Sequence, residues 1–302
     1  MHRSVIVLLS TYNGERFLYP QLYSLTQQKG VQLQVVIRDD ESTDGTVSIL
    51  RDYQNNNSSF IWYSGRNIGP AKSFWDLICR APDSEYYAFC DQDDVWMDDK
   101  LFVAVECLKQ YDDGPALYCS AYQMTDKDLN PIKTSTITPN IDIYHAILEN
   151  SATGCTMVFN KKLMQIIKSY APDYYFMHDE WVYKVCVAIG GKVIYDSQSH
   201  ILYRQHGNNV IGGLHEPWLK RLRSHISKLF LPSSHHRYKT VLEIYRGFRD
   251  FIPENNRIIF QKILMSNKFP YNWILAFNQN FYRKTTIKQA IKIFFLFIMK
   301  KF

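Results

Sequence analysis

Short apolar runs alternate with amphipathic segments along the first 110 residues of the chain. The apolar runs, which predict buried strands, lie at residues 4–9, 31–37, 60–63 and 86–90. The segments with the apolar spacing of helices lie at residues 15–28, 46–54, 71–79 and 100–110. This alternation predicts an α/β fold with a mostly parallel central sheet flanked by helices.

The pattern is less regular after residue 110. Further strands are predicted at residues 116–124, 154–159, 192–196 and 201–203, and further helices at 161–169 and 180–189. Beyond Trp218 the pattern is helical to the end, interrupted by Pro232, Pro253 and Pro270. We therefore predict a sheet-containing unit at residues 1–214 and a helical region at residues 215–302.

The charge is distributed unevenly between these two parts. The whole chain has 35 lysines and arginines against 29 aspartates and glutamates, whereas the part from residue 215 onward has 17 against 4. Nucleic acid and an anionic membrane surface are both candidate partners for such a basic region. The region is also apolar and aromatic, which favours the membrane.

The composition limits the class of protein. A hydrophobic fraction of 46% supports a substantial core. The six cysteines have no CxxC spacing, which is typical of buried thiols in a reducing compartment. No segment has the features of a signal peptide or the length of a membrane span, so a cytoplasmic location is expected.

Three carboxylates follow the apolar run at residues 86–90. Asp91, Asp93 and Asp94 repel one another unless a cation neutralises them. Mg²⁺ and Mn²⁺ bind carboxylate oxygens and keep open positions for phosphate oxygens. If the segment stays extended, Asp91 and Asp93 share one face and Asp94 braces the loop from the other. The alternative is a solvated acidic turn.

A second acidic pair, Asp39 and Asp40, follows the predicted strand at residues 31–37. Loops at the carboxyl ends of parallel strands gather at one edge of the sheet, where open α/β sheets bind ligands. Both acidic groups fall on such loops. No GxGxxG follows the first strand, which argues against a dinucleotide-dependent oxidoreductase.

Three residues farther along the chain complete the candidate chemistry. Asp179 follows the aromatic residues 174–176 and is a candidate general base, although it is also placed to cap the helix that follows. Arg204 suits a diphosphate because its guanidinium binds in a bidentate fashion. His206 is a candidate metal ligand or simply a solvated side chain.

Together these motifs resemble the family 2 glycosyltransferases, which have the GT-A fold. The matching segments are residues 10–14 (STYNG), 38–46 (RDDESTDGT), 91–96 (DQDDVW), 177–181 (MHDEW) and 203–212 (YRQHGNNVIG). They span residues 4–212 in the family's order. The later motifs resemble most closely those of bacterial rhamnosyltransferases that build surface polysaccharides such as O-antigen.

The resemblance implies a nucleotide-sugar site at the first two motifs. Ser10 and Tyr12 match residues that hold the nucleotide, with the tyrosine ring against the base. Thr11 and Asn13 belong to the same segment. Asp40 matches the carboxylate that accepts the imide N–H of uracil or thymine, while Asp39 is expected to support the turn.

The resemblance also implies the reacting groups. Asp91 and Asp93 match the DxD motif, in which the second aspartate binds the metal and the first contacts the sugar or ribose. Asp179 matches the catalytic base. Arg204 and His206 match a segment that contacts the diphosphate and the metal. Close relatives often have tryptophan at the position of Glu180, a departure that bears on acceptor selectivity.

The last segment combines charge with apolar residues. Lysines and arginines surround the apolar run at residues 293–299, which is too short to span a bilayer. A helix of this kind can lie in the lipid headgroup layer. Residues 218–228 offer a similar basic surface. The alternative is a last helix that packs on the enzyme or on a second subunit.

The sequence therefore predicts an inverting glycosyltransferase that depends on Mn²⁺ or Mg²⁺. The expected donor is dTDP-β-L-rhamnose, with a UDP-hexose or UDP-N-acetylhexosamine as the alternative. The expected acceptor is a lipid-linked glycan at the inner face of a bacterial plasma membrane, and nucleic acid is not an expected partner. The alternative from another class is a nucleotide-sugar-binding protein without activity.

Overall fold

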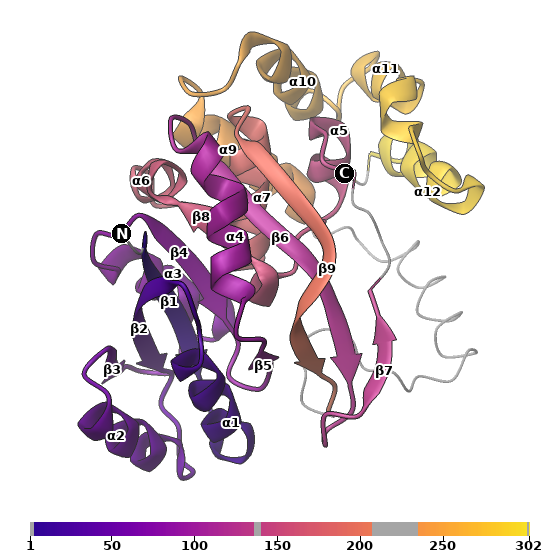
Figure 1. Ribbon diagram of the computed structural model, residues 1–302. Coiled ribbons are helices and arrows are strands. Elements are labelled where there is room, and N and C mark those ends of the chain that lie inside the picture. The colour runs from indigo at the N-terminus through magenta and orange to yellow at the C-terminus, as the bar shows by residue number, and fades with distance from the viewer. Residues whose placement is uncertain (1–2, 136–139, 207–234, 301) are drawn as a thin grey trace.

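In the computed structural model, which describes residues 3–135, 140–206, 235–300 and 302, helices surround a curled nine-stranded sheet (Figure 1). The strand order is β3-β2-β1-β4-β8-β6-β9-β5, and β7 pairs with β6. The predicted α/β fold is confirmed. The sheet is parallel through its first four strands and becomes mixed where β8 joins antiparallel to β4.

The first four strands match the apolar runs of the sequence. They are β1 (Arg3–Thr11), β2 (Val31–Asp39), β3 (Phe60–Ser64) and β4 (Tyr86–Cys90). The helices between and after them are α1 (Glu15–Thr26), α2 (Thr46–Asn56), α3 (Pro70–Arg80) and α4 (Lys100–Leu108). Alternate residues of β1 point to opposite faces, so Val5 and Leu9 pack in one core and Ile6 in another.

The second half of the sheet differs in detail from the prediction. Its strands are β5 (Val95–Trp96), β6 (Ala116–Thr125), β7 (Pro131–Thr134), β8 (Val158–Asn160) and β9 (Lys192–Arg204). The two short strands predicted at 192–196 and 201–203 are one strand, because irregularities in the pairing of β6 with β9 let the ladder continue. Residues 154–156 form a 3₁₀ turn and not the start of a strand.

Three helices pack around this half. They are α5 (Ile143–Leu148), α6 (Lys161–Lys168) and α7 (His178–Ala188). The prediction missed α5. It also began the last of these helices at residue 180, two residues too late.

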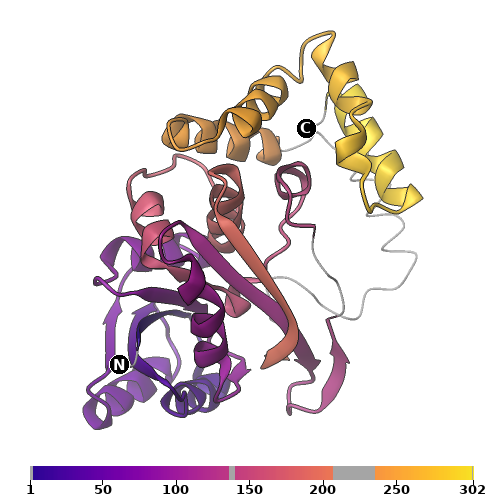
Figure 2. The ribbon, with the colours of Figure 1, turned by 45° about the horizontal axis from the view of Figure 1, so that its top comes forward.

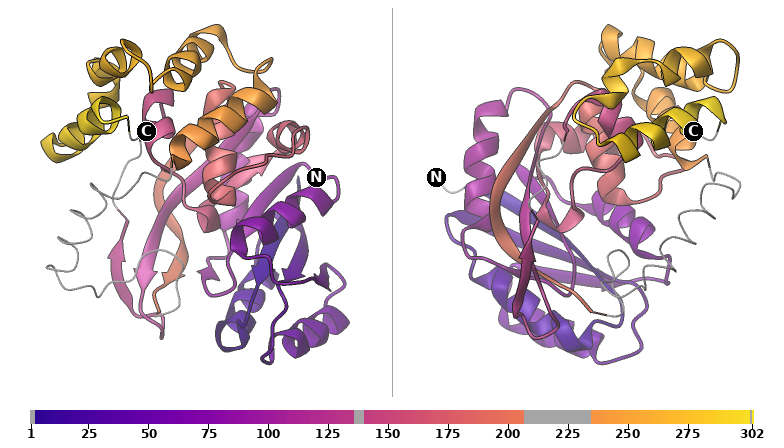
Figure 3. Two further views of the ribbon diagram at one scale, coloured as in Figure 1. Left: turned by 180° about the vertical axis from the view of Figure 1, so that it is seen from behind. Right: turned by 90° about the vertical axis from the view of Figure 1, so that its right-hand side faces the viewer.

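The chain after residue 234 is helical, as predicted, at one end of the molecule (Figure 2). Its elements are α9 (His236–Phe248), α10 (Glu254–Leu264), α11 (Tyr271–Ala276), the 3₁₀ helix η3 (Gln279–Tyr282) and α12 (Ile287–Ile298). In both views of Figure 3 this end lies opposite α1 and α2. The predicted boundary at 214/215, the surface at 218–228 and the motif residues 207–212 lie outside the described residues.

Two further predictions concern the whole chain. All six cysteines are free, and Cys90, Cys119, Cys155 and Cys186 are buried. Among the described residues, no helix combines the length and the apolar character needed to cross a membrane.

Candidate active site

The carboxyl ends of β1, β2 and β4 form the edge of the sheet where the first motifs meet. Thr11 is paired with Asp39, and Leu9 with Cys90, so the residues that follow these strands emerge side by side. These are Tyr12, Asp40 and Asp91. The predicted convergence of polar loops at this edge is confirmed.

Asp39 is fully buried and holds this edge together. Its carboxylate accepts hydrogen bonds from the hydroxyl of Thr11 at 3.1 Å, from the backbone N–H and hydroxyl of Ser42, and from the hydroxyl of Ser64 at 3.2 Å. Four bonds use the acceptor capacity of a carboxylate. Asp39 therefore supports the turn, and the Thr11 hydroxyl is directed inward.

Asp40 is also buried and has protein partners. Its carboxylate accepts the backbone N–H groups of Ile68 at 3.0 Å and Gly69 at 2.9 Å, and it pairs with Arg38. Ser10 is hydrogen-bonded through its hydroxyl to Ser73 at 2.6 Å. Both predicted nucleotide ligands thus lie at the expected edge, where Asp40 holds the loop at residues 66–69 and Ser10 contacts α3.

Gln92, which the sequence analysis passed over, joins two of the motifs. Its amide accepts the N–H of Tyr12 at 2.9 Å and donates to the carbonyl of Tyr12 at 3.0 Å. A Cβ at Gly14 would lie 2.2 Å from the amide oxygen, so a larger residue there would displace the Gln92 amide. These two hydrogen bonds hold the backbone of Tyr12, and its ring is half exposed at the edge of the sheet. The side-chain oxygen of the next residue, Asn13, accepts the N–H of Thr43 at 2.8 Å.

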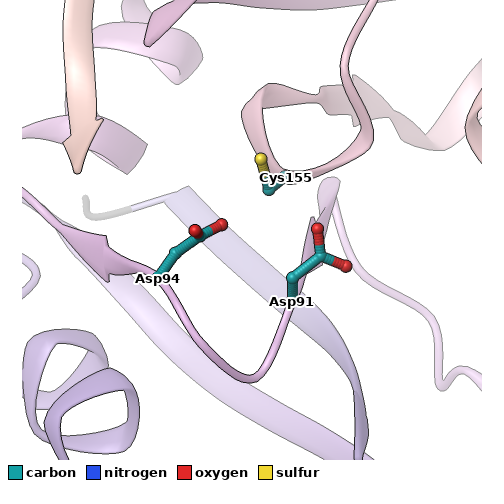
Figure 4. Close-up of side chains that lie close together, drawn as sticks. All are labelled: Asp91, Asp94 and Cys155. Carbon is teal, nitrogen blue, oxygen red and sulfur yellow. The ribbon is translucent and has the colours of Figure 1, made fainter. Parts of the chain in front are cut away.

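The DxD segment is not extended, and the predicted pairing of faces is wrong. Because β4 ends at Cys90 and the chain turns, Asp91 converges with Asp94 and with Cys155 from the turn before β8 (Figure 4). One ligand atom of each lies within 4.8 Å of the others. Asp94 still braces the loop as expected, because it accepts the N–H of Arg204 at 3.0 Å.

Asp93 faces the end of β9. Its carboxylate lies 2.7 Å from Nε2 of His206, and its carbonyl accepts a hydrogen bond from Nε of Arg204 at 2.7 Å. The ring of Phe17 packs against both, 4.8 Å from the His206 ring and 4.7 Å from the guanidinium. The structure thus brings Asp93, Arg204 and His206 together, as the sequence predicted.

These groups fit a hard divalent cation. Burial, then the negative charges of Asp93 and Asp179, raise the pKa of Asp91 to about 7. Among the described residues, no lysine or arginine forms an ion pair with Asp91, so a cation would relieve the repulsion. Burial raises the pKa of the Cys155 thiol well above its usual value, which leaves carboxylates and imidazole as the available ligands.

Asp179 lies in the first turn of α7, and the predicted alternative that it caps this helix is wrong because Met177 is the N-cap. Its carboxylate accepts the side-chain N–H of Asn150 at 3.0 Å and the backbone N–H of Glu180 at 2.7 Å. Burial raises its pKa to about 6 despite these bonds. Such a carboxylate is suited to accept a proton near neutral pH.

Glu180 points away from this reaction site. It is buried and forms an ion pair with Lys184 one turn along α7. The lysine therefore compensates the charge at the position where close relatives often have tryptophan.

Comparison with known proteins gives a family match and several related sequences. The family model of glycosyl transferase family 2 matches residues 6–167. A dTDP-rhamnosyl transferase, RfbG of Shigella flexneri, is 29% identical over 225 residues, which are 68% of this chain and 73% of that protein.

Two solved structures have the same fold. TarS of S. aureus in complex with UDP-GlcNAc superposes with a TM-score of 0.60 at 18% identity, covering 98% of this chain and 81% of TarS. The mannosyltransferase PcManGT from Pyrobaculum calidifontis, in complex with GDP-Man and Mn²⁺, gives a TM-score of 0.53 at 16% identity, covering 100% of this chain and 87% of that one.

Proposed function

The chain belongs to glycosyl transferase family 2, and from this premise we propose that it transfers L-rhamnose from dTDP-β-L-rhamnose, with inversion, to a lipid-linked polysaccharide acceptor. The resemblance to RfbG supports the sugar and the nucleotide. The observation that carries the chemistry is the position of Asp179, a half-buried carboxylate whose pKa is raised to about 6 and whose negative charge helps to raise the pKa of Asp91 in the DxD segment.

In this mechanism Asp179 takes the proton from the acceptor hydroxyl while that oxygen attacks the anomeric carbon of the donor. The bond between the sugar and the nucleotide diphosphate breaks as the new glycosidic bond forms. Asn150 and the N–H of Glu180 hold the carboxylate in one orientation. Arg204 and the DxD segment lie on the side where the diphosphate leaves.

The donor half of the site follows from the edge of the sheet. We assign the nucleotide to the exposed ring of Tyr12 and the loop held by Asp40, with Ser10, Thr11 and Asn13 shaping its floor. Asp93, with Asp91 and His206 beside it, would hold Mn²⁺ or Mg²⁺, which when bound offsets the negative charge of the diphosphate.

The C-terminal helix supports a location at the membrane surface. Ile287, Ile291, Phe295 and Met299 recur every four residues on α12 and are all exposed, while Ile293 and Phe297 on the other side are buried. Exposed lysines 288, 292 and 300 flank the stripe. An apolar stripe bordered by cations matches an anionic bilayer surface, so we propose peripheral binding at the inner face of the plasma membrane.

A donor panel tests the function. Purified protein with Mn²⁺ is titrated calorimetrically with dTDP-β-L-rhamnose, UDP-glucose and UDP-N-acetylglucosamine, and release of the nucleotide diphosphate is followed in each case. We expect the dTDP sugar to bind most tightly. Tighter binding of either UDP sugar would show that the donor is a UDP sugar and not dTDP-rhamnose. Binding without any hydrolysis or transfer would indicate a nucleotide-sugar-binding protein.

The Asp179→Asn variant tests the base. Because the amide keeps the shape but accepts no proton, we expect turnover to fall by about 10²–10⁴-fold with donor affinity unchanged. Equal turnover in the variant would refute the assignment. The Asp173→Asn variant, which changes a carboxylate in the loop before α7, is the control and should behave as the wild type.

A further inference from the structure

A cavity of about 570 Å³ lies between the sheet and the C-terminal region, and Asn150 is among the residues that line it. Its walls come from β6 and β9, from the segment around α5, and from the segment leading into α12. This volume is within the range of roughly 300–1,000 Å³ that is typical of ligand pockets. We propose that this cavity binds the non-reducing end of the acceptor glycan, an inference that rests on the proposed function.

The cavity adjoins the proposed base. Asn150 lines it and donates its side-chain N–H to Oδ2 of Asp179. Thr153 also lines it, and the next residue, Gly154, packs so closely that a Cβ there would lie 3.2 Å from Cβ of Asp179. Asp179 does not itself line the cavity, but this end of the cavity is separated from its carboxylate by a single residue, so a glycan bound there would present its reacting hydroxyl past Asn150.

The lining has the chemistry of a saccharide site. Leu148 and Ile293 are its two aliphatic residues, and the other described lining residues carry hydroxyl, amide, imidazole, carboxylate or ammonium groups. Tyr122 and Tyr195 add aromatic rings. Sugars present hydroxyl groups together with apolar C–H faces, and rings combined with polar groups satisfy both.

His145 is a buried member of the cavity wall. It is more than nine-tenths buried and lines the cavity. Its Nδ1 is held by Asp142 at 2.8 Å, whereas Nε2 has no hydrogen-bond partner among the described residues. Its imidazole is therefore a polar part of the wall whose orientation Asp142 fixes.

The charges argue for a neutral sugar and against a second nucleotide. Lys284 is the one lysine or arginine among the described lining residues, and Glu149 lies in the same wall. A diphosphate would need more positive charge than this. The C-terminal region, through Lys284 and Gln289, thus completes the acceptor site as well as offering a membrane surface.

Binding of octyl glycosides tests the proposal without requiring turnover. The probes are the octyl glycosides of rhamnose, glucose, galactose and N-acetylglucosamine, observed by saturation-transfer NMR. We expect at least one to bind to the wild type and to Asp179→Asn, and its affinity to fall at least tenfold in Tyr195→Ala and in Lys284→Glu. Tyr195→Phe, which keeps the ring, should lose less glycoside affinity than Tyr195→Ala. It also controls for misfolding, because it is a smaller change than the removal of the whole ring.

Matched controls separate a local effect from a general one. Tyr23→Ala removes an exposed tyrosine from α1, and Lys162→Glu reverses an exposed charge on α6 that does not line the cavity. Both should bind the glycoside as the wild type does. Undiminished binding in Tyr195→Ala and Lys284→Glu, or no glycoside binding to the wild type, would overturn the cavity assignment. If the proposed function itself were wrong, the result would be different: the calorimetric titration would show no binding of a nucleotide sugar.

Discussion

The ionisation of one carboxylate, Asp179, is expected to set the lower pH limit of turnover. A base works only when deprotonated, and burial raises the pKa of Asp179 to about 6, with Glu180 adding to the rise. We therefore expect the rate to be full above this pH and to fall about tenfold per pH unit below it. The pH dependence of kcat with saturating donor checks this.

The Asn150→Ala variant gives the matching control for that pH profile. Its hydrogen bond favours the charged form of Asp179, so its removal should shift the acid limb to higher pH. An acid limb that stays in place in this variant would show that another group controls the profile.

A second residue-scale prediction concerns the buried pair Glu180 and Lys184. Removal of one partner leaves an uncompensated buried charge, so Lys184→Met should lower the free energy of unfolding by about 3–5 kcal/mol. Urea denaturation measures the loss. The control is Lys109→Met, which breaks the exposed pair with Glu106 and should cost at most about 1 kcal/mol. Equal costs for the two variants would contradict the argument.

At this scale the sequence brought together the motif residues better than the side chains that support them. Asp93, Arg204 and His206 were found because they occur in motifs with a known order. Asn150 and Gln92 were missed because their partners lie 29 and 80 positions away, where no local pattern reports the contact. The prediction that Asp91 and Asp93 share one face was wrong for a related reason. The alternation of side chains along a strand does not continue through a turn.

At the scale of elements, the predictions were most accurate where burial dictates the pattern. β4 is enclosed on both faces and its predicted bounds, residues 86–90, match the structure. The exposed edge strand β7 and the two-residue β5 carry no such signal and were missed. β9 was divided because residues 197 and 198 are polar and exposed, although the pairing with β6 resumes at Ser199 after a shift in register.

The outer stripe of α12 gives the prediction at this scale. Ile291→Asp and Phe295→Asp place charges on exposed positions, so they should leave the thermal midpoint unchanged while reducing binding to phosphatidylglycerol vesicles at least tenfold. Vesicle flotation measures the binding, which high salt should also weaken. Ile132→Asp, an exposed change on β7, is the control. Unaltered flotation of the α12 variants would exclude the stripe as the membrane contact.

At the scale of the whole molecule, the sheet and the C-terminal helices share one core. Trp181 and Val182 of α7 belong to the same buried cluster as Val241 and Phe248 of α9 and Phe297 of α12. Of these helices, α12 also lines the cavity beside Asn150 and turns its apolar stripe outward. An acceptor anchored in a membrane would therefore meet the membrane-facing surface and the proposed glycan site on one part of the molecule.

This shared core predicts a single cooperative unfolding transition. Because separating the helices would expose the buried face of α7, neither part should unfold alone, and calorimetric and van't Hoff enthalpies should agree. Donor binding at the sheet edge should then raise the melting temperature of the whole chain, as reported both by Trp96 in the sheet and by Trp273 in α11. Two transitions, with the donor shifting only one, would mean that the helices are a separate unit and would weaken the case that they help to hold the acceptor.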